Sequence, residues 1–527
     1  MNLSVRYSNG KSKKHAFAAI IVACVALLLP SCCLPKLHCA HKGAPLPDSF
    51  NGATSVENSA RLGYREFFND PALTTLIDQA MFGNQELQIL AQEIQIANNE
   101  IMSRRGDYLP FVNLRGSAGV EKPSLFTPLG TVEDQLEPIP GVGFPDPLPD
   151  FLLAADISWE VDIWRKLRNA RDAATMRYLG TIEGRNYIVT RLVADVAEDY
   201  YELLALDNRL ETLDATIAIQ QQSLELSKAK KEAARGTELA VQRFEAEVRK
   251  NQSEKLIIQQ AIVEAENRIN FNIGRYPQRV ERPSTDFINL NLRALSLGVP
   301  GELLRNRPDI REAERELAAA GLDVRVARAR FFPSLDIIGG VGFQAFNPRY
   351  LFWTPESLIY SAAGDVVAPL INRKAIKADY LSANARQIQS VYNYQRVILD
   401  AYTEVINNMA KVVNYGQSIE IKKMQLAALE ASVDSATKLF QNARTEYMNV
   451  LFSQRDLMEA RMVLIETKQQ QLTAIVNAYQ ALGGGGYPGF GVLGEGEEVP
   501  PEGEIIFPQG GINPPEMLPR PIPNGQE

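Results

Sequence analysis

The side chains best suited to metal or covalent chemistry are confined to the start of the chain. All four cysteines and all three histidines of the 527 residues precede residue 42. The run His38–His41 ("HCAH") places two imidazoles and a thiol close together, with Cys33 nearby, and such ligands suit zinc or copper. The surrounding segment is punctuated by proline and has no predicted scaffold to orient ligands. We therefore expect no metal site and no cofactor.

The rest of the chain has neither a thiol nor an imidazole. This excludes disulfide frameworks, Cys/His zinc sites and Ser-His or Cys-His catalysis there. Asp and Glu are scattered over helix faces that should be solvated, and no phosphate-binding loop is present, so we expect that the protein is not an enzyme. The formal net charge of -8 argues against nucleic acid as a partner.

Cys32 is a candidate for covalent lipid attachment. A basic segment precedes the apolar run "AFAAIIVACVALLL", which is too short to span a bilayer comfortably and ends at "LPSC". This pattern resembles a bacterial lipobox, in which the cysteine becomes the lipidated N-terminus after removal of a signal peptide, here residues 1–31. Cys33 follows in place of an aspartate, which suits sorting to the outer membrane. The alternative is an ordinary cleaved signal peptide.

Two blocks without proline, residues 150–276 and 370–487, are rich in good helix formers and carry charges throughout. The charges exclude membrane-spanning helices. In the first block, apolar residues recur at spacings of three and four, which indicates a coiled-coil seam: Leu203, Leu206, Leu210, Leu213 and Ile217. Each block should form a hairpin of two long helices, and a helix of about 65 residues would extend about 100 Å.

The chain is a tandem duplication. Residues 103–120 ("SRRGDYLPFVNLRGSAGV") share a pattern with residues 327–343 ("ARARFFPSLDIIGGVGF"), and "IWRK" at 163–166 corresponds to "INRK" at 371–374. The spacing is about 208 to 223 residues. Each copy predicts a helix, a strand, a loop, a second strand and a long helical hairpin.

This periodicity divides the chain into five regions. We expect a signal peptide, a lipid-anchored tether with an N-terminal segment, a first structural repeat, a second structural repeat and a Gly-, Pro- and acid-rich disordered tail: residues 1–31, 32–69, 70–285, 286–486 and 487–527. Gly274 and Gly483 are the expected ends of the two hairpins.

Four strands of about ten residues are predicted, at 111–120, 152–161, 334–343 and 358–368. This length suits a tilted strand that crosses a bilayer. The alternation alone fits a half-buried soluble sheet equally well, but the export signal favours a membrane β-barrel. Four strands cannot close a barrel, and open edges are not tolerated in lipid. Two protomers would give eight strands around a filled interior, whereas three would give twelve and could leave an opening.

The chain resembles the TolC-like outer membrane efflux proteins, especially their lipoprotein branch. The resemblance extends over about residues 60 to 486 and is carried by "LLRNRPDIREAERELAAAGLDVRVARARFFPSL", "DISWEVDIWRKLRNARDAA" and "YQALGGG". It implies a mainly α fold that forms a homotrimer with a 12-stranded barrel and a periplasmic α-helical tunnel. It also implies lipid anchoring in the outer membrane, a periplasmic adaptor and an inner-membrane pump of the RND type. The implied function is a passive exit duct for small molecules.

Two sets of site residues follow from the resemblance. The hairpin tips should contact the adaptor: Ala234, Arg235, Gly236, Thr237, Ala443, Arg444, Thr445 and Glu446. Family members usually carry glycine where this chain has Ala234 and Ala443. Near the second tip, Met448, Phe452 and Asp456 are candidates for a periplasmic gate, in which a hydrophobic ring would block ions by dewetting. The alternative is that Met448 and Phe452 are ordinary core residues of the coiled coil.

Two other functions remain open. The chain could be a coiled-coil lipoprotein scaffold that links envelope layers, in which case it would not conduct ions. It could also be the exit duct of a type I protein secretion system.

Overall fold

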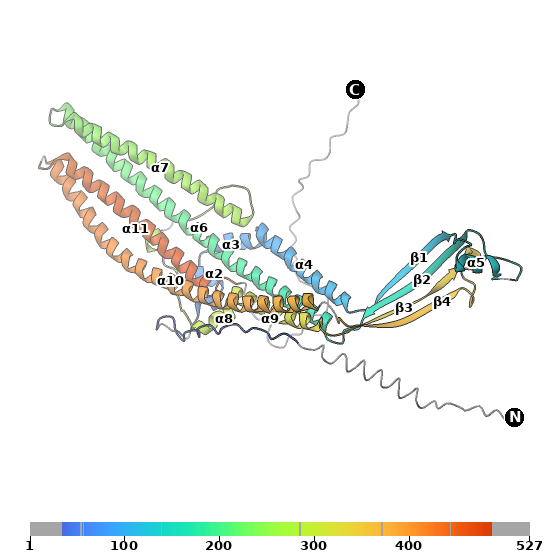
Figure 1. Cartoon of the computed structure of the whole chain (residues 1–527). Helices are drawn as coiled ribbons and strands as arrows, with labels where there is room; N and C mark the ends of the chain where they lie inside the picture. The colour runs from blue at the N-terminus through green and yellow to red at the C-terminus, as the bar shows by residue number, and fades with distance from the viewer. Residues whose placement is uncertain are drawn as a thin grey trace, which may run out of the picture. The chain divides into compact units, whose positions relative to one another are not determined.

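The computed structural model describes residues 34–52, 55, 57–138, 140–283, 286–369, 373–442 and 444–486 (Figure 1). The expected signal peptide, the expected lipid-attachment residue Cys32, the tip residue Ala443 and the expected disordered tail lie outside the described residues. Everything below concerns the part of the chain up to Gly486, which forms one compact unit.

Each copy contains a helix, two strands and a long helical hairpin, as expected. The first copy consists of α3 (Pro71–Gly83), α4 (Gln85–Asp107), β1 (Phe111–Glu121), α5 (Pro128–Gln135), β2 (Leu148–Glu160), α6 (Lys166–Glu232) and α7 (Glu238–Ile273). The second consists of α8 (Leu303–Asn306), α9 (Pro308–Ala329), β3 (Ser334–Ala345), β4 (Leu358–Val367), α10 (Lys374–Gln441) and α11 (Tyr447–Ala481). The short elements are η2 (Ser59–Arg61), α2 (Tyr64–Phe68), η3 (Phe287–Asn289), η4 (Pro300–Glu302) and η5 (Pro348–Tyr350).

The long helices have the predicted length, and the second helix of each hairpin ends at or near a glycine. α6 and α10 contain 67 and 68 residues, so each extends about 100 Å. Gly274 ends α7 with φ 80° and Gly483 follows α11 with φ 93°, both in the left-handed region that glycine adopts without steric cost. Both predicted helix ends are therefore confirmed. Among the described residues, no helix combines the length and apolar character that a membrane-crossing helix requires.

The main core joins the two copies. Tyr200 and Tyr201 of α6 are fully buried, and Phe67 of α2 stacks on Tyr479 of α11 with ring centroids 3.9 Å apart. The predicted seam residues Leu203, Leu206, Leu213 and Ile217 are all buried, and Leu210 packs against the same cluster.

The helices next to the sheet form a layer whose order follows the order of the strands. α4 packs on α6, α6 on α9, and α9 on α10. The sheet has the order β1-β2-β3-β4, with every neighbouring pair antiparallel. α4 and β1 therefore lie at one edge of the unit, and α10 and β4 at the other.

An N-terminal strap, residues 34–52, is fastened along α10. The backbone of His38 exchanges hydrogen bonds with the side chain of Asn384, at 2.9 and 3.1 Å. Further along, the Tyr402 hydroxyl donates to the carbonyl of Ser49 at 3.1 Å. Because later strap residues contact later residues of α10, the strap follows α10 away from the sheet.

Candidate functional site

The pairing register gives the sheet two chemically distinct faces. All charged residues of the four strands lie on one face, together with Asn113 and Ser361: Arg115, Glu121, Asp150, Asp156, Glu160, Asp336 and Asp365. Among the described strand residues, the opposite face has no charged side chain and includes Val112, Leu114, Val120, Phe151, Leu153, Ile157, Leu335, Ile337, Val341, Phe343, Tyr360 and Val366. Leu114 and Tyr360 are 79% and 82% exposed, so this apolar face is uncovered in the single chain.

The polar face carries an arrangement that requires water. Asp336 lies directly opposite Glu160 on one neighbouring strand and Asp365 on the other. Like charges directly opposite each other destabilise a dry sheet. Among the described residues, only Glu160 of these three carboxylates forms an ion pair, with Lys166. We infer that the polar face is solvated.

The two sheet edges are open. In the described part of the chain, β1 and β4 each pair on one side only. Every residue of both strands is exposed. Unpaired backbone groups at such edges are a template for another strand.

The first hairpin tip has an alanine, Ala234, at the left-handed position where glycine is usual. After α6, Arg235 N–H donates to the Lys230 carbonyl at 2.8 Å and Ala234 N–H to the Lys231 carbonyl at 2.9 Å. This pair of bonds is the Schellman motif, which places one residue in the left-handed region, usually glycine. Here Ala234 has φ 55°. Thr237 then caps α7 by accepting from Ala240 N–H at 3.3 Å.

The second tip makes the equivalent bond. Arg444 N–H donates to the Leu439 carbonyl at 2.9 Å, as Arg235 does to Lys230. The two tips are also joined directly, because the Lys230 ammonium donates to the Phe440 carbonyl at 2.9 Å and lies 3.5 Å from the centroid of its ring. Burial lowers the pKa of Lys230. The structure thus brings the two predicted tips together through residues that the sequence did not single out.

The three proposed gate residues occupy different environments. Met448 is half-buried and packs against a small cluster between the hairpins, formed by Leu224, Val241, Phe244 and Leu451. Phe452 is 43% exposed, and the Arg455 guanidinium lies 5.2 Å from the centroid of its ring. Arg455 also forms an ion pair with the exposed Asp456 at 3.3 Å. Phe452 is therefore linked to Asp456 through Arg455, whereas Met448 faces the first hairpin; a gating role stays a prediction.

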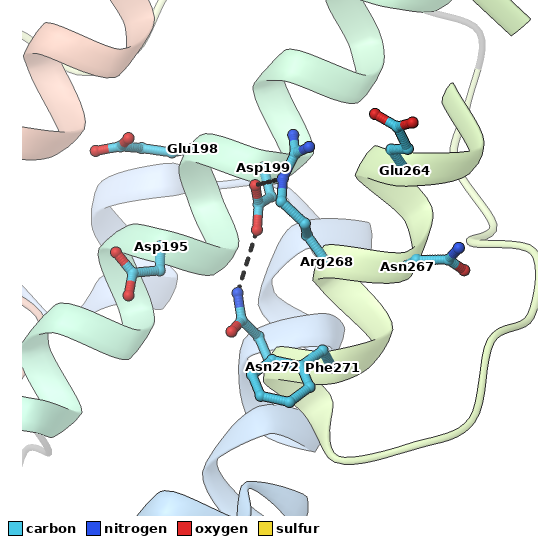
Figure 2. A pocket seen from close by; sticks show the side chains of 8 residues that line it. All are labelled: Asp195, Glu198, Asp199, Glu264, Asn267, Arg268, Phe271 and Asn272. Carbon is cyan, nitrogen blue, oxygen red and sulfur yellow. Dashed lines mark hydrogen bonds and ion pairs between the residues drawn. The ribbon is translucent and has the colours of Figure 1, made fainter. Parts of the chain in front are cut away.

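An acidic groove that the sequence did not single out lies between α6 and α7, with a volume of about 670 Å³. Figure 2 shows Asp199 between Arg268 and Asn272, with Glu198 directed away from them. Arg268 forms an ion pair with Asp199 at 2.9 Å, and Asn272 donates to Asp199 at 3.1 Å. Burial and the neighbouring Asp195 raise the pKa of Glu198 to about 7. The only sequence signal was the spacing of carboxylates at 195, 198 and 199 on one helix.

The "HCAH" run is attached to α10 through hydrogen bonds of its backbone rather than of its histidine side chains. His38 bonds Asn384 as described above, and His41 N–H donates to the Tyr392 hydroxyl at 3.2 Å. Within the described residues, no group of three or more His, Cys, Asp or Glu side chains is arranged to hold a metal ion.

These features define a class: a duplicated, two-hairpin channel subunit with a two-faced sheet. The family model described as "Outer membrane efflux protein" matches residues 76–275 and 299–484. The chain therefore belongs to this outer membrane efflux family, and the resemblance predicted from the sequence is confirmed.

Named relatives cover most of the chain. It is 27% identical over 467 residues to the cation efflux system protein CusC of Escherichia coli, covering 88% of this chain and 97% of the relative. It is 27% identical over 423 residues to the solvent efflux pump outer membrane protein SrpC of Pseudomonas putida, covering 80% of this chain and 87% of the relative. It is 25% identical over 447 residues to the probable outer membrane lipoprotein SilC of Salmonella typhimurium, covering 84% and 93%.

Solved structures confirm the fold class. The crystal structure of CusC matches with a TM-score of 0.74 at 24% identity, over 86% of this chain and 99% of that one. The open state of the MtrE outer membrane channel of Neisseria gonorrhoeae matches with a TM-score of 0.74 at 20% identity, over 86% of this chain and 98% of that one. The chain has the fold of the TolC-like channels.

Proposed function

We propose that three copies of this chain form a passive exit duct in the outer membrane for small molecules from the periplasm. The observation that carries this proposal is the two-faced sheet with open edges. A membrane barrel places apolar side chains towards lipid and polar side chains towards a water-filled interior, and the face assignment above has this form.

Closure of the barrel requires neighbouring copies. The open edges of β1 and β4 would be left without hydrogen-bond partners in lipid, which is not tolerated. Joining β1 of one copy to β4 of the next in a ring of three gives twelve strands, enough to leave a central opening. The duct performs no chemical step, so its selectivity lies in its width and its charges.

The helical layer supports the same ring. At the α4 edge, Ile89 and Ile96 are 60% and 67% exposed, and at the α10 edge Leu399, Ile421 and Met424 are 63% to 68% exposed. Two different apolar stripes at opposite edges suit a head-to-tail interface, which closes into a ring when the rotation permits. The helices of three copies would then continue the barrel as a periplasmic tunnel.

The strap supports the lipid anchor at Cys32. Leu34 and Leu37, just downstream, pack against a small cluster that includes Phe331 and Tyr380, where α9 ends and α10 begins next to the sheet. An acyl chain on a residue two positions before Leu34 would therefore enter the bilayer beside the proposed barrel.

The tips and the gate complete the proposal. Exposed Arg235 and Arg444 at the joined tips would contact a periplasmic adaptor, which would couple the duct to an inner-membrane pump of the RND type. Met448, Phe452 and Asp456 would narrow the tunnel near that end. The relatives named above handle cations in one case and solvents in another, so we assign no narrower substrate class than small molecules.

The test combines conductance with crosslinking. Purified full-length protein should form a trimer in detergent and conduct ions in a planar bilayer. In a background with Cys33 and Cys39 changed to serine, Ser117→Cys on β1 plus Ser361→Cys on β4 should give crosslinked trimers with a short bifunctional maleimide. Each single cysteine variant is the control and should give no trimer ladder.

Two outcomes would contradict the proposal. A folded monomer without conductance would favour the envelope scaffold. Loss of a secreted protein, with unchanged small-molecule resistance, after deletion of the gene would favour a type I secretion duct.

A further inference from the structure

Three buried amide side chains interrupt the apolar packing of the helical hairpins. Gln220 of α6, Asn251 of α7 and Gln454 of α11 are 1%, 0% and 6% exposed. We call these three residues the amide layer. Gln220 lies three residues after Ile217 and four before Leu224, so it occupies a position of the seam that the sequence predicts.

The amide layer is only partly satisfied by hydrogen bonds. Asn251 Nδ2 donates to Gln220 Oε1 at 2.7 Å, and Gln454 Nε2 donates to the Ser223 hydroxyl at 3.2 Å. Ser223 is three residues after Gln220 on α6, so the three amides lie within about one helical turn of each other. The other polar atom of each amide has no hydrogen-bond partner among the described residues: Gln220 Nε2, Asn251 Oδ1 and Gln454 Oε1.

This arrangement favours separation of the helices at the amide layer. A buried polar atom without a partner destabilises the packed state, whereas the same atom is hydrated once the helices move apart. Polar side chains at seam positions also select one register of neighbouring helices, at a cost in stability. The amide layer therefore specifies how the helices align and at the same time weakens their packing.

The amide layer separates two apolar clusters of very different size. On the side towards the sheet, the main core extends as far as Ile217 of α6 and Ile258 of α7. On the side towards the tips, the described residues form only one small buried cluster: Leu224, Val241, Phe244 and Leu451. Segments with little buried apolar area open at a lower free energy than the rest of a protein.

We propose that the amide layer is the boundary of a tip unit that opens by itself while the rest of the hairpins stays packed. The tip unit consists of residues 221–250 of the first hairpin and residues 447–453 of α11. When it opens, water reaches the amide layer and hydrates its unpaired atoms. When it closes, the seam amides restore the register of α6, α7 and α11.

The tip unit has a consequence for transport that rests on the proposed function. The hairpin tips form the periplasmic end of the proposed duct, and the tip unit allows this end to loosen while the main core keeps the tunnel intact. The existence of the tip unit does not depend on the duct, so the two are tested separately.

Hydrogen exchange with mass spectrometry on the full-length protein in detergent measures the opening directly. In the wild type, peptides from residues 221–250 should exchange together and about a hundredfold faster than peptides from residues 190–217, with a step at the amide layer. Equal protection on the two sides would overturn the proposal. A gradual increase towards the turn without a step would indicate fraying of the helix ends and would also overturn it.

A double-variant cycle isolates the contribution of the amides. Gln220→Leu alone and Asn251→Leu alone each leave a buried amide without its partner, so each single variant should exchange faster in the tip unit than the wild type. Gln220→Leu/Asn251→Leu removes both partners and connects the two apolar clusters, so exchange there should be about tenfold slower than in the wild type. Equal or faster exchange in the double variant would overturn the proposal.

The matched control is Gln221→Leu/Gln222→Leu. It adds two leucines at exposed positions of α6 beside the amide layer, and the tip unit should exchange as in the wild type. If the double variant of the amide layer does not fold, the wild-type exchange profile decides the question, because it needs no substitution.

Planar-bilayer conductance of the same preparations reports the proposed duct. The double variant of the amide layer should open less often than the wild type, because its tip unit is held closed. A conducting wild type without a step in exchange refutes only the tip unit. A wild type that shows the step but does not conduct refutes the duct and leaves the tip unit in place.

Discussion

Glu198 in the acidic groove should make the stability of the protein depend on pH. Burial and repulsion by Asp195 raise its pKa from 4.5 to about 7 in the folded chain. Between these values the folded state binds more protons than the unfolded state, so the free energy of unfolding falls as pH rises through this window. Replacing Glu198 by glutamine, which mimics the protonated form, should remove this loss.

The magnitude follows from the size of the shift. A shift from 4.5 to about 7 corresponds to at most about 3.4 kcal/mol, at about 1.36 kcal/mol per pKa unit. Glu198 is only partly shielded from water, and screening reduces the effect, so we expect about 1–2 kcal/mol. Glu198→Gln should therefore unfold at higher temperature than the wild type at pH 8 and at nearly the same temperature at pH 4.5.

Circular dichroism on heating the full-length protein in detergent measures this difference. Glu264→Gln is the control, because Glu264 lines the same groove but is exposed to water, so its variant should show no gain that depends on pH. A gain for Glu198→Gln of equal size at both pH values, or a loss at pH 8, would refute the reasoning.

Three further predictions concern the tip, the gate and the anchor. Ala234→Gly should relieve about 1–2 kcal/mol of strain from the left-handed backbone, while the added flexibility of glycine costs about 0.5–1 kcal/mol, so the thermal unfolding temperature should rise slightly. Ala233→Gly is the control: Ala233 has φ -79°, so there is no strain to relieve and its variant should unfold at a lower temperature. Phe452→Asp should place three like charges in the tunnel, repelling by about 1 kcal/mol per pair or more, and so raise single-channel conductance with a cation preference; an unfolded, non-conducting protein would instead make Phe452 a core residue. Cys32→Ser should abolish labelling by radioactive palmitate, yet leave the trimer intact on native gels.

The fold could be predicted from the sequence because its signals are long and repeated. Proline-free blocks, a seam through Leu203 and Leu213, and a duplicated helix-to-strand passage each extend over many residues, so no single exception obscures them. The strands observed at Ser334–Ala345 and Leu358–Val367 lie within two residues of those expected.

The candidate site was harder to predict from the sequence than the fold, because it depends on contacts between segments that are far apart in the chain. The second copy is apolar on both faces of β3, as at Ile337 and Ile338, so only pairing with β2 shows which face carries the charges. Ala234 could be singled out by comparison with glycine, but its left-handed φ required the structure. Glu198 looks like an ordinary solvated residue until α10 and α11 are placed beside it.

One geometrical rule connects the barrel and the tunnel. The helix order α4-α6-α9-α10 repeats the strand order β1-β2-β3-β4, because each helix in this layer continues directly into or out of the strand beside it. A neighbouring copy that pairs its β4 with β1 must therefore also bring its α10 against α4. The strand edge supplies directional hydrogen bonds and the helix edge supplies apolar area, so the two interfaces should form together. A substitution that introduces charge at Ile89 or Leu399 in the helical layer should then weaken the pairing of strands to which neither residue belongs.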